Sequence, residues 1–260
     1  MKVFDREQWD EKIALDGNWP DWFCSECMKG YLHPLLNTNT AEKELIAEAA
    51  EIKFLQNNDP GLDSDSYYVH TVIKLGCSNQ KCLSESLLSG VKTKEEHYYE
   101  DYGTRREGYM DYFEPLFFTR PPQVIYIPKD DLDESVKFLY QSFKIFFDDP
   151  SSAANKIRIF LDHLFPKKTN NSGTLHTRLE NELKQSHPDI FELFMACKWI
   201  GNDASHEGDI THDDILDAYE FIEAALDLMY PIEENTSSLL DKAGNINTNK
   251  QSLSKSNQET

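Results

Sequence analysis

Positive charge is scarce in this sequence. The 260 residues contain 26 Lys and Arg against 46 Asp and Glu, which leaves a net charge of −20. Affinity for nucleic acid comes largely from cations that displace counterions from phosphates. This imbalance therefore argues against non-specific DNA binding, unless a local basic patch outweighs the negative electrostatic potential of the rest of the protein. A solvated acidic surface is the simplest interpretation of the charge.

The sequence also lacks a long apolar run and a secretory signal. No apolar stretch approaches the roughly 18 residues that a membrane span needs. The first residues, MKVFDREQWDEK, are charged and lack the apolar middle of a signal peptide. We therefore expect a soluble, cytoplasmic protein without membrane contact. Hydrophobic residues still make up 39% of the chain, enough for a substantial core.

A disulfide framework is not expected, because the five cysteines are odd in number and no signal peptide precedes them. Cys197 lies in an apolar segment and is interpreted as a small buried residue. The other four form a Cys-x-x-Cys pair and a Cys-x-x-x-x-Cys pair, and each spacing lets a tight turn aim two thiolates at one tetrahedral ion. This pattern predicts a structural Zn²⁺ site, with four reduced thiols as the alternative. The predicted ligands are Cys24, Cys27, Cys77 and Cys82.

Segments on either side of the second cysteine pair have strand character. SYYVHTVIKLG (66–76) precedes the pair and LSESLLSGVKT (83–93) follows it, so Cys77 to Cys82 is expected at the tip of a hairpin. TAEKELIAEAAEIKFLQN (40–57) has the apolar spacing of a helix, which a zinc ribbon can carry as an insertion. Residues 96–128 are rich in Tyr, Phe and Arg. We expect an irregular connector there, packed against the next domain, with base stacking as the alternative.

Helical periodicity begins at Leu132. Five segments are amphipathic or apolar nearly all round, and their connections are short, which predicts an up-and-down bundle. In the last segment, Thr211 and Asp214 have the spacing of a capping box. Gly201, after the fourth segment, is expected to cap that helix at its C-terminal end. The five segments are 132–147, 151–165, 174–183, 188–200 and 211–230.

These patterns predict an α+β, mainly α fold, in which a helical bundle follows a small zinc-ribbon β domain with a helical insertion. The expected domains are residues 1–128 for the ribbon and 129–232 for the bundle. Residues 233–260 are polar and are expected to be disordered.

The stretch WIGNDASHEG is either an ordinary turn between two helices or a site. With VIYIP, IRIFLDHLF and TLHTRLENEL, it resembles the domain of unknown function 4145 family, a branch of the HEPN superfamily (higher eukaryotes and prokaryotes nucleotide-binding). The resemblance covers residues 125–230 and more loosely the ribbon before them. It implies that the bundle is HEPN-like and forms a homodimer through its helices.

Active HEPN ribonucleases need no metal and pair an arginine with a histidine a few residues later. By resemblance, His206 would be the acid or base and Asn202 the polar residue of the motif, whereas Gly201 stands at the arginine position. Arg158 and Lys198 are the nearby candidates to replace the missing cation. The structural alternative for Arg158 is a salt bridge to an acidic residue of a neighbouring helix.

The resemblance implies a HEPN-like module of a prokaryotic defence or stress-response protein, which senses or acts on RNA or nucleotides and has retained or lost nuclease activity. The main alternative is a non-catalytic, dimerising adaptor for a protein partner, which the acidic charge and Gly201 favour. A metal-independent endoribonuclease with His206 as acid or base is the weaker alternative. A DNA-binding regulator is weaker still, because the surroundings of the ribbon are not basic.

Overall fold

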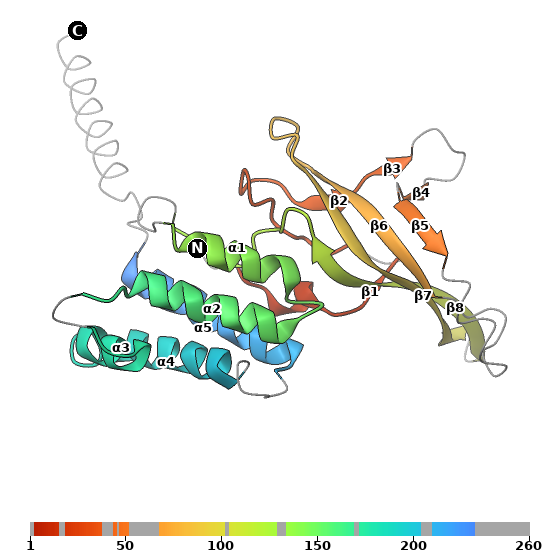
Figure 1. Cartoon of the computed structure of the whole chain (residues 1–260). Helices are drawn as coiled ribbons and strands as arrows, with labels where there is room; N and C mark the ends of the chain where they lie inside the picture. Colours follow the sequence, from red (N-terminus) through yellow and green to blue (C-terminus); the bar gives the residue numbers. More distant parts are fainter. Residues whose placement is uncertain are drawn as a thin grey trace, which may run out of the picture.

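The protein combines a curved antiparallel sheet with a group of helices at one end of it (Figure 1). The computed structural model describes residues 3–15, 19–37, 44–45, 47–51, 68–101, 104–128, 134–168, 172–203 and 210–231. None of the helices in these ranges is long and apolar enough to cross a membrane.

Three long strands, β6, β7 and β8, form the middle of the sheet, whose order is β1-β8-β7-β6-β2. All of its pairings are antiparallel, and β2 and β5 pair with different stretches of β6. A separate two-stranded sheet joins β3 and β4. The strand bounds are Ile13–Ala14 (β1), Leu32–Pro34 (β2), Leu36–Asn37 (β3), Glu44–Leu45 (β4), Ala47–Glu51 (β5), Tyr68–Cys77 (β6), Glu85–Asp101 (β7) and Thr104–Phe118 (β8).

The predicted fold class is wrong. In place of a mainly helical protein with a small ribbon, the described residues form a six-stranded antiparallel sheet beside five α-helices. The ladder between β7 and β8 extends from Leu88–Phe118 to Asp101–Thr104, far beyond the hairpin of a ribbon. Leu88 and Phe118 are fully buried, as are Ile73 and Leu75 of β6. The long strands therefore supply one wall of the core.

The helix predicted over residues 40–57 is wrong wherever the structure describes that segment. Glu44–Leu45 and Ala47–Glu51 are strands, and β5 pairs with Val69–Ile73 of β6. Hydrogen bonds to the open edge of β6 outweigh the helix propensity of the AEAAE stretch. The rest of the predicted helix lies outside the described residues.

The irregular connector predicted over residues 96–128 is also wrong, because most of it belongs to β7 and β8. Tyrosine and phenylalanine favour strands, and here they lie on a long hairpin. Arg105 lies with its guanidinium carbon 4.2 Å from the ring centroid of Tyr98, so this arginine stacks within its own hairpin.

The five predicted helices are present. Thr211 caps the last of them, and its side chain and that of Asp214 form the predicted capping box. Asp149 caps α2 by accepting a hydrogen bond from the Ser152 N–H, just before Pro150 starts the helix. The helix bounds are Val136–Ile145 (α1), Pro150–Leu164 (α2), Leu175–Leu183 (α3), Pro188–Asp203 (α4) and His212–Met229 (α5).

Gly201 does not cap α4, because the helix continues to Asp203. A Cβ atom built at Gly201 would lie 2.8 Å from the Arg158 Cβ and 3.0 Å from the Ala154 carbonyl oxygen. Real Cβ atoms essentially never approach other heavy atoms below about 3 Å, so the glycine is needed where α2 and α4 touch.

The sheet and the helices share one hydrophobic core. Trp22 is fully buried, and its ring centroid lies 5.3 Å from that of Phe118 in β8 and 6.4 Å from that of Phe147 beyond α1. Apolar packing is therefore continuous across residue 128, where the sequence predicts a domain boundary.

Candidate functional site

The four predicted zinc ligands lie together. Their sulfur atoms are all within 4.8 Å of one another, with Cys24 Sγ 3.8 Å from Cys82 Sγ and Cys27 Sγ 3.7 Å from Cys77 Sγ. A tetrahedral ion with Zn–S bonds of about 2.3 Å requires sulfurs about 3.8 Å apart. Two of the sulfur–sulfur distances have this value and none exceeds 4.8 Å, so the cluster suits one tetrahedral metal ion, whereas a disulfide would need two sulfurs at about 2.05 Å.

Two turns of similar geometry carry the cysteine pairs. In each, the residue after the second cysteine has a left-handed backbone, with φ of 52° at Met28 and 54° at Leu83. The second turn closes the hairpin between β6 and β7, as the sequence predicts. Asn79 in that turn donates its backbone N–H to Cys77 Sγ at 3.4 Å and its side-chain amide to Cys27 Sγ at 3.6 Å. Hydrogen bonds of this kind stabilise thiolates.

The thiols differ in acidity. Burial opposes the Cys27 thiolate, but hydrogen bonds from the Lys29 backbone N–H and the Asn79 amide outweigh it and lower the pKa of Cys27 to about 6. Burial and the neighbouring thiols raise the pKa of Cys77 to about 12. The protein alone thus favours the Cys27 thiolate and disfavours the Cys77 thiolate, which a bound cation would stabilise.

A cavity of about 800 Å³ opens beside the cysteines. Its lining includes Lys29 and Lys81, and no carboxylate is among the described residues that line it. Four thiolates around a divalent ion carry a net charge of about −2, which two nearby ammonium groups would offset. The local charge therefore also suits a four-thiolate metal site within an acidic protein.

The helical residues singled out in the sequence lie where α2 meets α4. Asn202 is half-buried near the end of α4, and Arg158 of α2 lies directly against Gly201. An arginine side chain at position 201 would have no room without separating the two helices. His206 lies outside the described residues, so the structure does not place it relative to Asn202 or Arg158.

Arg158 is held by neighbours on its own helix. It hydrogen-bonds the Asn155 side-chain oxygen at 3.3 and 3.4 Å and pairs with Asp162 at 3.5 Å. Asp162 also pairs with the buried Arg178 of α3, which donates to the Gly173 carbonyl oxygen at 3.1 Å. Arg158 therefore pairs with an acidic residue of its own helix, and not with one of a neighbouring helix as the sequence suggested. The network joins α2 to α3.

One feature of this region escapes the sequence patterns. Trp199 is 52% exposed although it belongs to the largely apolar helix α4, whereas the neighbouring Lys198 is only 8% exposed. The Lys198 Nζ lies 3.4 Å from the centroid of the Trp199 ring. Burial lowers the pKa of Lys198, and the negative charge of Asp203 on the same helix partly opposes that shift. The His176 ring of α3 lies 6.3 Å from that of Trp199.

The protein thus combines a cysteine cluster with the geometry of a metal site and an antiparallel sheet that shares its core with five helices. Residues 140–249 match the family described as domain of unknown function (DUF4145), the family that the helical motifs resemble. Residues 14–118, which include the four clustered cysteines, match the family described as domain of unknown function (DUF8608). No curated protein and no solved structure matches the chain.

Proposed function

We propose that this chain is a zinc-stabilised, HEPN-like module of a prokaryotic defence or stress-response protein, which binds RNA or nucleotides without cleaving them. The observation that carries the binding role is the nearly buried Lys198 ammonium against the exposed indole of Trp199. The defence setting follows from the family resemblance alone.

Zinc is the proposed ion because the ligands are four thiolates in tetrahedral spacing. Four protein ligands leave no open coordination position, so the ion would contribute to stability and would take no part in a reaction. Cys24, Cys27, Cys77 and Cys82 would hold it.

The pair of Lys198 and Trp199 suits a nucleotide for two reasons. An exposed indole offers a face on which a base can stack, and stacking tolerates any base. The lysine ammonium lies over the ring, so its positive charge would be close to the phosphate of a nucleotide whose base stacks on the indole. Arg158 and Asn202, on the adjoining α2–α4 contact, are the further candidates to meet the ligand.

Cleavage is not proposed, because the arginine that active HEPN ribonucleases carry beside the polar residue has no counterpart at position 201. The contact between α2 and α4 leaves no room for a side chain at position 201. Arg158 is engaged by a hydrogen bond to Asn155 and an ion pair with Asp162. The charge of −20 also weakens attraction to phosphates, so binding should be modest and should fall with added salt.

Removing the indole tests the proposal. Trp199→Ala should weaken binding of a fluorescein-labelled single-stranded oligouridine about 5- to 150-fold, because stacking one base contributes about 1–3 kcal/mol. Fluorescence anisotropy at low salt measures the affinity. Trp199→Phe should retain most of it. Leu228→Ala is the matched control, since Leu228 is a 54% exposed apolar residue on another helix.

An unchanged affinity in Trp199→Ala, or no measurable binding by the wild type, would contradict the proposal. Cleavage of the oligonucleotide by the wild type in the presence of a chelator, lost in His206→Ala, would instead establish the metal-independent nuclease. These outcomes are separable, because cleavage is read on a denaturing gel and binding by anisotropy.

The dimerising adaptor is the second candidate, and the exposed Trp199 favours it too, since an indole at a surface also suits a self-complementary interface. Light scattering at micromolar concentration should then give twice the chain mass of 30.1 kDa. Deleting residues 233–260 should leave that mass ratio unchanged, because this polar segment has little to bury. A monomer at this concentration would speak against the dimer.

A further inference from the structure

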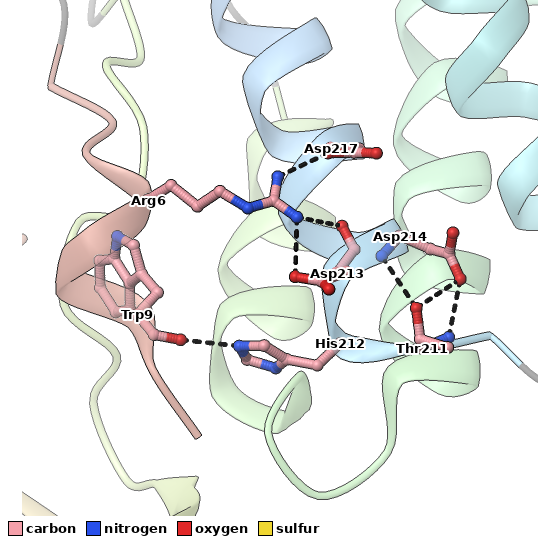
Figure 2. A network of polar contacts seen from close by, with 7 residues as sticks. All are labelled: Arg6, Trp9, Thr211, His212, Asp213, Asp214 and Asp217. Atoms are coloured by element: carbon pink, nitrogen blue, oxygen red, sulfur yellow. Dashed lines mark hydrogen bonds and ion pairs between the residues drawn. The ribbon is translucent and has the colours of Figure 1, made fainter. Parts of the chain in front are cut away.

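The segment of residues 3–10, here called the N-terminal strap, is bound to the beginning of α5 (Figure 2). Arg6 pairs with Asp213 at 2.8 Å and with Asp217 at 2.5 Å, both in the first turns of that helix. His212, its first residue, donates a hydrogen bond from Nε2 to the Trp9 carbonyl oxygen at 2.7 Å. The strap thus restrains the place where the chain enters α5.

A buried carboxylate fixes the other end of the strap. Glu223 of α5 is 2% exposed and accepts hydrogen bonds from the backbone N–H groups of Val3 at 2.9 Å and Phe4 at 3.1 Å. It also accepts one from the N–H of Tyr126, in the segment that leads to α1, at 2.7 Å. The strap is therefore held at two points on the same helix.

Aromatic rings continue from the strap into the sheet. Trp9 stacks on Trp22 with centroids 5.5 Å apart and planes 13° from parallel. The Trp22 indole N–H donates to the Gln8 carbonyl oxygen at 2.7 Å. On the helix side, the His212 ring lies 5.4 Å from Phe146 and 5.2 Å from Phe147. These rings form a packed column from Trp22 to the first residue of α5.

The column ends at the cysteine cluster. Trp22 stands two residues before Cys24, whose sulfur belongs to the cluster and whose side chain is 1% exposed. The Cys24 backbone is also restrained, because its N–H donates a hydrogen bond to the Gly30 carbonyl oxygen at 2.8 Å. Leu32 N–H donates to the Trp22 carbonyl oxygen at 2.8 Å. An ion that holds Cys24 therefore also orders the segment that carries Trp22.

We propose that metal occupancy of the cysteine cluster and the order of the first turn of α5 are linked through Trp22, Trp9 and His212. Loss of the ion releases Cys24, which loosens Trp22, then the strap, and then the entry into α5. Residues 204–209, which contain His206, join that entry to the end of α4, which carries Lys198 and Trp199. An effect of the ion on ligand binding at Lys198 and Trp199 rests on the proposed function, whereas the linkage between metal occupancy and the order of α5 does not.

Reciprocity follows from the thermodynamics of linked equilibria. If the ion stabilises the docked strap by some factor, then a docked strap raises the affinity for the ion by the same factor. Coupling energies in proteins correspond to changes of about 5- to 150-fold. The link can thus be measured from either end.

Hydrogen exchange of the full chain, with and without Zn²⁺, tests the first direction. Removing the ion with a chelator under reducing conditions should speed amide exchange about 5- to 150-fold in residues 3–10 and 211–217. Exchange in α3, which packs against α4 away from the strap, should change little. Unchanged exchange at 211–217, or equal acceleration in α3 and α5, would overturn the proposal.

Weakening the strap tests the reverse direction. Arg6→Gln removes two partly exposed ion pairs to α5 and should lower the Zn²⁺ affinity about 2- to 5-fold in competition with a chromogenic chelator. Lys184→Gln is the matched control, because it removes an exposed ion pair to Glu180 on α3 and should leave that affinity unchanged. Equal affinities for wild type and Arg6→Gln would count against the link. Neither experiment uses RNA, so the linkage and the proposed function can fail separately.

Discussion

Glu223→Ala should lower the free energy of unfolding by at least about 3 kcal/mol. The change leaves the N–H groups of Val3, Phe4 and Tyr126 buried without an acceptor. Each such group costs about 1–3 kcal/mol. Urea denaturation followed by tryptophan fluorescence measures the loss, because Trp9 and Trp22 report on the strap.

The free energy of unfolding of Glu223→Gln should lie between that of the wild type and that of Glu223→Ala. An amide oxygen can still accept, but it lacks the charge that strengthens these bonds, and its NH₂ group faces another donor. Asp227→Ala is the control on the same helix and should change stability by less than about 0.5 kcal/mol, because the side chain is only partly buried and its charge lies near the C-terminal end of α5. A Glu223→Ala protein as stable as the Asp227→Ala protein would disprove the role assigned to the carboxylate.

Cys77→Ser should abolish stoichiometric metal binding. The purified wild type should contain about one Zn²⁺ per chain, since four thiolates in tetrahedral spacing form a closed structural site. The serine hydroxyl is a poor ligand for zinc, and the content after dialysis should fall close to zero. Elemental analysis measures the zinc content per chain. Loss of the ion should also lower the melting temperature, because the free energy of metal binding at such sites contributes to folding.

Cys197→Ser is the matched control for the cluster. Cys197 is fully buried in α4, where its thiol lies 3.5 Å from the Ala218 carbonyl oxygen, and it is not among the clustered cysteines. Its replacement should leave the zinc content at about one per chain. Wild-type protein without zinc, or Cys77→Ser with unchanged zinc, would refute the metal assignment.

The cysteine cluster was predictable because its information is local. The spacing of each pair shows that one turn can direct two thiolates to one point, whatever the surrounding fold. The helices were predictable for a similar reason, since the capping box of Thr211 and Asp214 and the apolar periodicity both act within one element.

The sheet was not predictable in this way. The AEAAE stretch is made of helix formers, and it becomes β5 only because β6 offers an open edge formed by Val69–Ile73. Gly201 likewise looks like a helix cap in sequence, and only the approach of Arg158 and Ala154 shows why a side chain is excluded there. The exposure of Trp199 also depends on how α3 and α4 pack. Tertiary contacts decide all three, and sequence patterns do not contain them.

The strap has a consequence for the order of events during synthesis. Val3 and the carboxylate that binds it are separated by 220 residues. At about 5–20 residues per second, a ribosome needs roughly 10–40 s to add that length of chain. Throughout this interval the Val3 and Phe4 amides and the Trp9 carbonyl oxygen lack their partners on α5. Residues made almost first are thus among the last to complete their native contacts, and the nascent chain carries these unpaired backbone groups until the final helix emerges.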